Sequence, residues 1–239
     1  MIAKTVFNRA AAGPHPRYDA APLRCHTPAD PLSLWVLWLA VILAVGPFIA
    51  RRIILLGDDD SLHWMAVDYS ARCISLIGVI IGFRSGLLQS EQPRTGLLRS
   101  FLIFLLLFVV QCAEQVFGGP VIQHYFHFSQ TTAWPPIPVP ILRVADLSFG
   151  LLFAVFVEEM VFRKFLFAVV ERWLPQRSLV IIISATVFGL VHFTSGVVDT
   201  MVNAFVNGIL FAIAYWQTRR LSICVASHYL IDFLIFSSQ

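Results

Sequence analysis

Acidic and basic side chains that can activate water occur in three short segments of the second half of the chain. Glu158 and Glu159 are adjacent, and Arg163 follows Glu159 by four residues, which is one helical turn along the same face. Glu159 and Arg163 can therefore form an ion pair within one helix. Because Glu158 points about 100° away from Glu159 around that helix, it is left available for other chemistry.

Two histidines complete the set of reactive side chains. His192 follows Phe188 by four residues, and His228 precedes Asp232 by four, so each pair shares one face of a helix. Glu158, His192 and His228 could bind a divalent metal such as zinc, in the manner of hydrolases that use two histidines and one glutamate. The same groups could act without a metal, with the glutamate as general base and the histidines as oxyanion donors or proton carriers. Both alternatives lead to attack by water on a polarised carbonyl.

The elements that must position these side chains are hydrophobic helices. The chain has 239 residues, of which 58% are hydrophobic and 13% charged. Its apolar residues lie in runs of roughly 20, the length that crosses a bilayer core. The runs are continuous rather than alternating, which favours helices over a closed β-barrel. We therefore predict an all-α, polytopic, multi-pass membrane protein of about seven transmembrane helices, with the site between the last four.

The expected transmembrane helices are 32–50, 65–83, 101–119, 146–170, 178–193, 197–217 and 222–236. Asp68 and Arg72 lie one turn apart in the second, where they must pair or stay in the interface. The basic connectors after the second, fourth and sixth helices are expected on the cytoplasmic side, which places the amino terminus inside and the carboxyl terminus outside. Arg51 and Arg52 then fall on the wrong side.

Three units are expected along the chain. Residues 1–31 are interpreted as a polar, loosely ordered tail, 32–144 as amino-terminal transmembrane helices with their loops, and 145–239 as the catalytic helix core. The net charge of +3 comes from basic residues spread over connectors, which excludes nucleic acid as a partner. The expected partners are the lipid bilayer, in a cytoplasmic membrane, and a membrane-bound protein or peptide substrate.

The three reactive segments resemble the motifs of a known family. Residues 158–163 (EEMVFR), 188–192 (FGLVH) and 228–232 (HYLID) are similar to the EExxxR, FxxxH and HxxxN/D motifs of the CPBP intramembrane proteases. This family is also called the CAAX-protease and bacteriocin-processing (Abi) family, and it includes the Ras-converting prenyl-protein endopeptidases. Order and spacing agree for all three motifs, and the resemblance covers about residues 145 to 236.

The resemblance implies an intramembrane endopeptidase whose site opens towards the cytoplasmic side. By family role, Glu158 would activate water with His192, and His228 with Asp232 would stabilise the oxyanion or complete a metal site. Glu159 and Arg163 would support the catalytic helix. The family is described both as metalloproteases and as glutamate proteases, so the resemblance leaves the cofactor open: a divalent metal or none.

Other interpretations of the same residues stay open. Glutamate and histidine inside a membrane are also typical of a transporter coupled to protons or cations. A catalytically inactive immunity or scaffold protein could keep the motif residues for stability. Glu114 is interpreted as an interfacial or bundle-facing polar group, and Asn203 and Asn207 as bundle-facing residues that pack helices. A last difficulty is depth, because His192 is expected near the end of its helix and Glu158 in the middle of another.

Overall fold

The computed structural model of the chain describes residues 31–55, 60–86, 88, 92–118, 121, 137, 139–174, 176–192 and 198–237. The predicted amino-terminal tail, apart from residue 31, lies outside these residues. Within them the chain is helical, which confirms the all-α prediction. Four helices are long and apolar enough to cross a membrane, namely Ser33–Ile54, Ser61–Arg84, Leu97–Gly118 and Pro140–Trp173.

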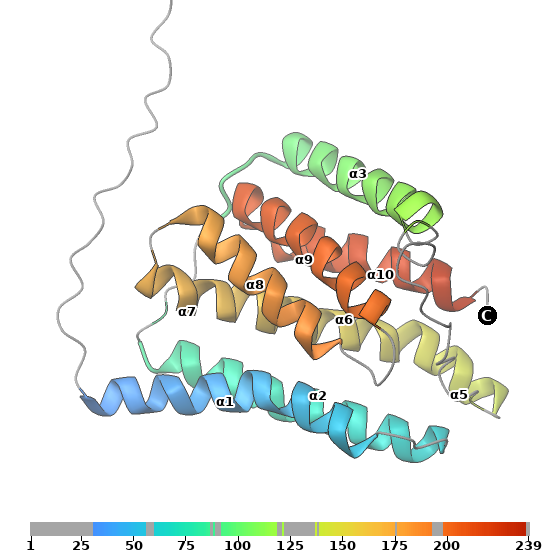
Figure 1. Cartoon of the computed structure of the whole chain (residues 1–239), viewed down its shortest axis with the longest axis horizontal. Helices are drawn as coiled ribbons and strands as arrows, with labels where there is room; N and C mark the ends of the chain where they lie inside the picture. The colour runs from blue at the N-terminus through green and yellow to red at the C-terminus, as the bar shows by residue number, and fades with distance from the viewer. Residues whose placement is uncertain are drawn as a thin grey trace, which may run out of the picture.

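Seven helical rods follow one another along the described residues (Figure 1). The first three are α1 (Pro31–Ile54), α2 (Ser61–Arg84) and α3 (Leu97–Ala113), the last extended by the π-helical turn η1 (Glu114–Gly118). The fourth rod is continuous and consists of α5 (Pro140–Ala145), η2 (Asp146–Gly150), α6 (Leu151–Glu159), η3 (Met160–Phe165) and α7 (Leu166–Trp173). The last three are α8 (Arg177–Val191), α9 (Val198–Thr218) and α10 (Leu221–Ser237).

Several helix boundaries differ from the expected ones for local reasons. The second helix begins at Ser61 rather than 65, because the Asp60 side chain accepts hydrogen bonds from the first free backbone N–H groups. The fourth begins at Pro140 rather than 146, since proline suits the first turn of a helix. The first continues past Arg51 to Ile54, because Arg51 is buried against α2 instead of marking the membrane surface.

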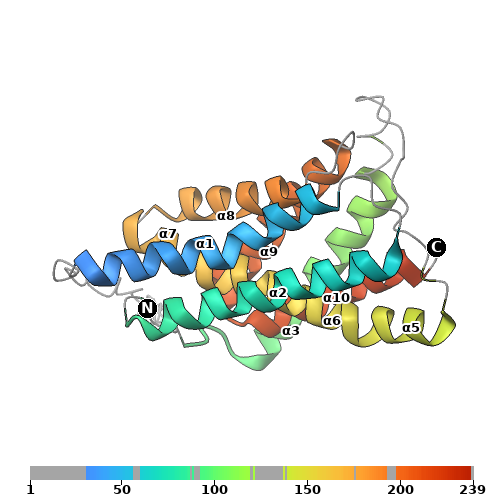
Figure 2. The same ribbon diagram turned by 90° about the horizontal axis from the view of Figure 1, so that it is seen from below.

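The pair α1 and α2 lies along one side of the molecule, and Figure 2 shows the two helices side by side. Their close approach depends on small residues. A Cβ atom added at Gly78 would lie only 2.5 Å from the backbone nitrogen of Ala44, and Ala40 and Ala44 are fully buried. Small residues at a crossing let two membrane helices pack backbone to backbone.

The fourth rod forms the centre of the bundle, between the α1 and α2 pair and the last three helices (Figure 1). Phe162 joins the two sides, since its ring meets Phe48 of α1 at 5.3 Å and Phe188 of α8 at 5.2 Å between centroids. Such edge-to-face pairs each add about 0.5 to 1.5 kcal/mol beyond burial. The rod that bears Glu158 and Glu159 thus contacts helices on both of its sides.

Candidate active site

Glu158 stands where three motif segments meet. It is buried near the end of α6, and its Oε1 atom accepts a hydrogen bond from Arg72 Nη1 at 2.8 Å. Its Oε2 atom lies 3.8 Å from His192 Nε2 and 3.9 Å from His228 Nε2. One carboxylate oxygen is therefore held by a guanidinium, and the other faces two imidazoles.

His192 owes its orientation to the residue four positions before it. It follows the last residue of α8, and its Nδ1 atom lies 2.7 Å from the Phe188 carbonyl oxygen. A carbonyl only accepts, so Nδ1 carries the hydrogen and Nε2 is directed at Glu158. The Phe188 ring packs on the imidazole at 4.5 Å between centroids. The FxxxH spacing thus fixes both the tautomer and the ring plane.

His228 of α10 is bounded by carboxylates on both edges. Its Nδ1 atom lies 2.9 Å from Glu159 Oε1, and its Nε2 atom lies 3.4 Å from Asp232 Oδ2. Phe211 of α9 stacks on the ring at 4.8 Å. Nδ1–H can donate to Glu159, while the Nε2 edge lies between Asp232 and Glu158 Oε2, 3.9 Å away, and can donate to negative charge that develops there.

Glu159 and Arg163 form the ion pair expected from their spacing. Arg163 Nε lies 3.2 Å from Glu159 Oε2, and both side chains are fully buried. The Arg163 guanidinium also lies 4.0 Å from the centre of the Phe188 ring and 5.1 Å from that of Phe211. Arg163 belongs to the π-helical turn η3, a type of irregularity that is frequent at functional sites. Arg163 thus contacts Phe188 of α8, the helix that His192 follows, and Phe211 of α9, the ring that stacks on His228 of α10.

The amino-terminal half contributes residues that the sequence did not assign to the site. Asp68 and Arg72 pair at 2.7 Å within α2, which is one of the two alternatives expected from their spacing. Arg72 also reaches Glu158, and Arg51 of α1 pairs with Asp68. The available signal was an ion pair inside an apolar segment, which normally marks a functional site. The site therefore extends beyond the last four rods to α1 and α2.

The expected structural interpretation of the other polar groups agrees with their contacts. Gln111 of α3 donates to Asn207 of α9 at 3.0 Å and accepts from Ser227 of α10 at 2.5 Å. Asn207 in turn donates to Glu114 at 3.2 Å and to Asn203 at 2.7 Å. Hydrogen bonds of this kind join three helices where lipid offers no partners.

The arrangement of possible ligands around Glu158 does not favour a bound metal ion. Among the described residues, no three His, Cys, Asp or Glu side chains are arranged to hold a metal ion. Glu158 Oε1 already bonds to Arg72, whose positive charge opposes a second cation beside the same carboxylate. The residues as arranged here do not fit a three-ligand metal centre. The assignment of Glu158, His192 and His228 as metal ligands is a prediction from the sequence alone.

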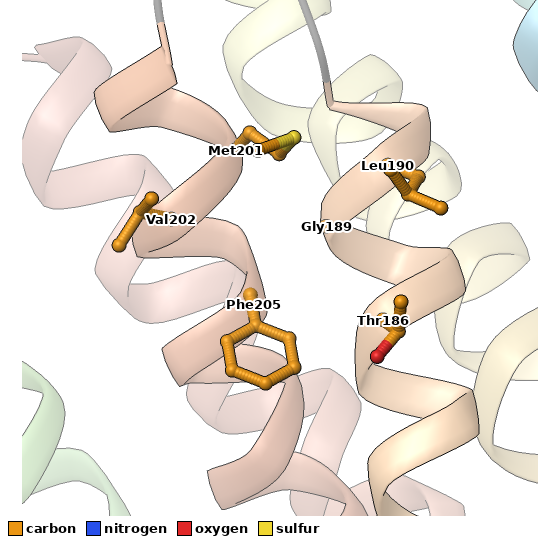
Figure 3. A pocket seen from close by; sticks show the side chains of 6 residues that line it. All are labelled: Thr186, Gly189, Leu190, Met201, Val202 and Phe205. Carbon is orange, nitrogen blue, oxygen red and sulfur yellow. The ribbon is translucent and has the colours of Figure 1, made fainter.

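An apolar pocket of roughly 160 Å³ opens between α8 and α9 (Figure 3). Thr186, Gly189 and Leu190 line it from α8, and Met201, Val202 and Phe205 face them from α9. It has no ionisable lining residue, so it is not the reactive centre. The helices almost touch here, since a Cβ atom at Gly189 would lie 3.0 Å from the Met201 carbonyl oxygen.

Comparison with known proteins agrees with the resemblance of the three motifs. Residues 140–234 match the model of a family described as type II CAAX prenyl endopeptidase Rce1-like. A comparison with curated proteins and one with solved structures gave no match. The matched segment contains all six predicted site residues and begins after α3.

Proposed function

Over residues 140–234 the chain belongs to the CPBP intramembrane protease family, which includes the CAAX prenyl endopeptidases, and on this premise we propose that Glu158 activates water to cleave a membrane-associated substrate. The observation that supports this most directly is the convergence of two histidines on one oxygen of Glu158. A carboxylate beside imidazoles inside a membrane is costly unless it serves a function.

The proposed first step is attack by water on the substrate carbonyl. Glu158 Oε2 and His192 Nε2 are 3.8 Å apart, too far for a direct hydrogen bond, and both can bond to one water placed beside them. Glu158 takes the proton as the water oxygen bonds to the carbonyl carbon. The oxyanion that forms accepts a hydrogen bond from His228 Nε2–H, a hydrogen that it shares with Asp232 Oδ2, while Glu159 holds Nδ1 in place.

The second step breaks the peptide bond. The tetrahedral carbon expels the amine, and Glu158 returns the proton to the leaving nitrogen, so the enzyme ends in its starting state. Arg163 has no direct part in these transfers. It neutralises Glu159 and packs between Phe188 and Phe211, the rings that contact His192 and His228.

The substrate class follows from the family and the membrane setting. We propose a protein or peptide that is held at the bilayer by apolar groups, with a prenylated carboxyl-terminal CAAX segment as the first candidate. A suitable probe is an internally quenched peptide that ends in a farnesylated cysteine and three aliphatic residues. Its unprenylated twin reports whether the lipid is required.

The test compares purified wild-type protein in detergent with Glu158→Gln, His192→Ala and His228→Ala. Cys73→Ala, on the exposed face of α2, is the matched control. We expect the wild type and the control to cleave the probe and each site variant to lose about 100-fold or more in kcat, the effect typical of general acid–base groups. Equal cleavage by all five proteins would mean that Glu158, His192 and His228 have no role in the reaction.

Two further arms separate the alternatives. Cleavage that survives incubation with EDTA or 1,10-phenanthroline supports the metal-independent route, and inhibition that added zinc reverses would overturn it. Ion flux in proteoliposomes that the same three substitutions abolish, without any cleavage by the wild type, would favour the transporter.

A further inference from the structure

The catalytic carboxylate is held from outside the family-matched segment. We infer that Arg72 of α2 is a positioning residue for Glu158, and that the α1 and α2 pair is for this reason part of the catalytic unit. The inference rests on the proposed function, because it concerns the same carboxylate. It adds a role for helices that the three motifs do not include.

The contacts of Arg72 leave Glu158 little freedom. The Nη1 atom of Arg72 donates to Glu158 Oε1 at 2.8 Å and to the Ala154 carbonyl oxygen of the same helix at 2.9 Å. Its Nε atom donates to Asp68 Oδ2 at 2.7 Å. Three acceptors hold the planar Arg72 guanidinium in one orientation. It engages Oε1, so the oxygen that faces both histidines is Oε2.

Arg72 is itself fixed by an alternating row of charges. Arg51 of α1 pairs with Asp68, which pairs with Arg72, which pairs with Glu158, and all four side chains are buried. The Phe48 ring lies beneath both guanidinium groups, 5.4 Å from that of Arg51 and 5.7 Å from that of Arg72. Opposite charges in such order compensate one another away from water.

The same helix pair also holds the segment that bears His192. Arg52 Nε donates to the Val191 carbonyl oxygen at 3.1 Å, one residue before the histidine. Both partners of the proposed water, Glu158 and His192, are thus tied to α1 and α2. Movement of this pair would change the distance between Glu158 Oε2 and His192 Nε2, on which the proton transfer depends.

A purely structural ion pair is the competing explanation, since removing one member of any buried pair destabilises a protein. The two explanations differ in what happens when the charge balance is restored. Replacing both Arg72 and Asp68 by neutral residues removes one positive and one negative charge, and an amide at position 68 still accepts from Arg51. Arg51 and Glu158 then balance each other in net charge but each lacks its direct ionic partner, so stability should recover in part, whereas the contact with Glu158 stays absent.

The experiment measures kcat, KM and thermal unfolding in detergent for the full chain, with the farnesylated quenched peptide as probe. The variants are Arg72→Gln, Arg72→Lys and the double variant Arg72→Gln with Asp68→Asn. Ser75→Ala is the control, because Ser75 is buried one turn further along α2 and its hydroxyl bonds to the Ala71 carbonyl.

We expect Arg72→Gln to lower kcat about 100-fold with KM unchanged, the cost of a misplaced reacting group. Arg72→Lys should keep more of kcat, and Ser75→Ala should match the wild type. The double variant should recover part of the lost unfolding temperature but none of the lost kcat. Recovery of kcat together with stability would overturn the inference, as would a kcat for Arg72→Gln equal to that of the wild type.

The two proposals fail in distinguishable ways. If the wild type does not cleave the probe, the proposed function falls and this inference falls with it. If the wild type cleaves, Glu158→Gln does not, and Arg72→Gln cleaves normally, the proposed function stands and only the positioning role of Arg72 is lost.

Discussion

Two of the ion pairs around Glu158 lie within single helices, whereas the hydrogen bond between Arg72 and Glu158 joins two helices. The pairs Glu159 with Arg163 and His228 with Asp232 are four residues apart and in contact, as one helical turn requires. Arg72 and Glu158 are 86 positions apart in sequence, and their hydrogen bond depends on how α2 packs against α6. No local pattern contains that information, so the sequence did not predict the partner of Glu158 Oε1.

Arg163 offers a test at this scale. Arg163→Met keeps most of the side-chain volume but removes the guanidinium from Oε2 of the fully buried Glu159 carboxylate, which keeps only His228 at Oε1. We expect a loss of about 3 to 5 kcal/mol in the free energy of unfolding, typical of a broken buried pair. Denaturant titration in detergent measures it.

The control for this substitution is the double variant Arg163→Met with Glu159→Gln. It removes the unpaired charge and should recover most of the lost stability, since a neutral amide can still accept from His228. A loss that persists in the double variant would mean that the guanidinium stabilises the fold through Phe188 and Phe211 rather than through the carboxylate.

At the scale of elements, hydrophobic runs predicted the number and order of the rods but not their ends. A run predicts where lipid-compatible residues begin and stop, and it assumes that a charged residue lies at the surface. Arg51 does not fit that assumption, because it is buried inside the bundle and forms an ion pair with Asp68 of the next helix. The π-helical turns within the fourth rod were also not predictable, since the apolar pattern continues through them.

The crossing of α1 and α2 gives a prediction about an element. Gly78→Ala places a Cβ atom 2.5 Å from Ala44 N and 2.9 Å from the Ala40 carbonyl oxygen, so the helices must separate. We expect a loss of about 1 to 3 kcal/mol from overpacking, together with lower kcat, because Arg72 and Glu158 move apart. Unfolding and peptide cleavage measure the two effects.

Gly46→Ala on α1 is the matched control. Its added Cβ atom would meet only Ile42 Cγ2 at 3.9 Å, an ordinary contact. It should leave kcat unchanged and raise stability slightly, because alanine favours a helix more than glycine does. A Gly78→Ala protein as stable and active as Gly46→Ala would contradict the close crossing.

At the scale of the whole molecule, the basic connectors and the site lie towards different ends of the bundle. Arg94, Arg172, Arg177 and Arg220 lie near the end where α8 begins and α9 stops. The positive-inside rule places this end in the cytoplasm. From this end, α8 runs for 15 residues, about 22 Å, before it reaches His192 beside Glu158. A bilayer core is about 30 Å thick, so His192 lies beyond its middle when counted from the basic end.

The depth of His192 follows from the short length of α8. Figure 1 shows this helix ending well before the end of the molecule that α5 and the carboxyl terminus of α10 occupy. Glu158 lies in the middle of a 34-residue rod, so a short α8 is what brings the two residues to one level. The same placement brings the site nearer to the face opposite the basic connectors. The family resemblance implied the cytoplasmic face instead.

Cysteine labelling decides between these two faces. In a chain freed of its native cysteines, Gln92→Cys and Gln176→Cys report the basic connectors, and Ser237→Cys reports the opposite end; all three positions are exposed. Asp232→Cys reports the site, because the Asp232 side chain is 26% exposed. A membrane-impermeant maleimide is added to sealed vesicles of each orientation.

We expect Gln92→Cys and Gln176→Cys to react from the cytoplasmic face, and Asp232→Cys to react together with Ser237→Cys from the other. The reason is distance, since a polar reagent that enters from the basic face must pass most of the bilayer core to reach position 232. Reaction of Asp232→Cys from the same face as Gln92→Cys would instead place the opening on the cytoplasmic side. Substrates would then have to reach the Glu158 carboxylate from the ends of α7 and α8, past the buried aromatic residues of the central rod.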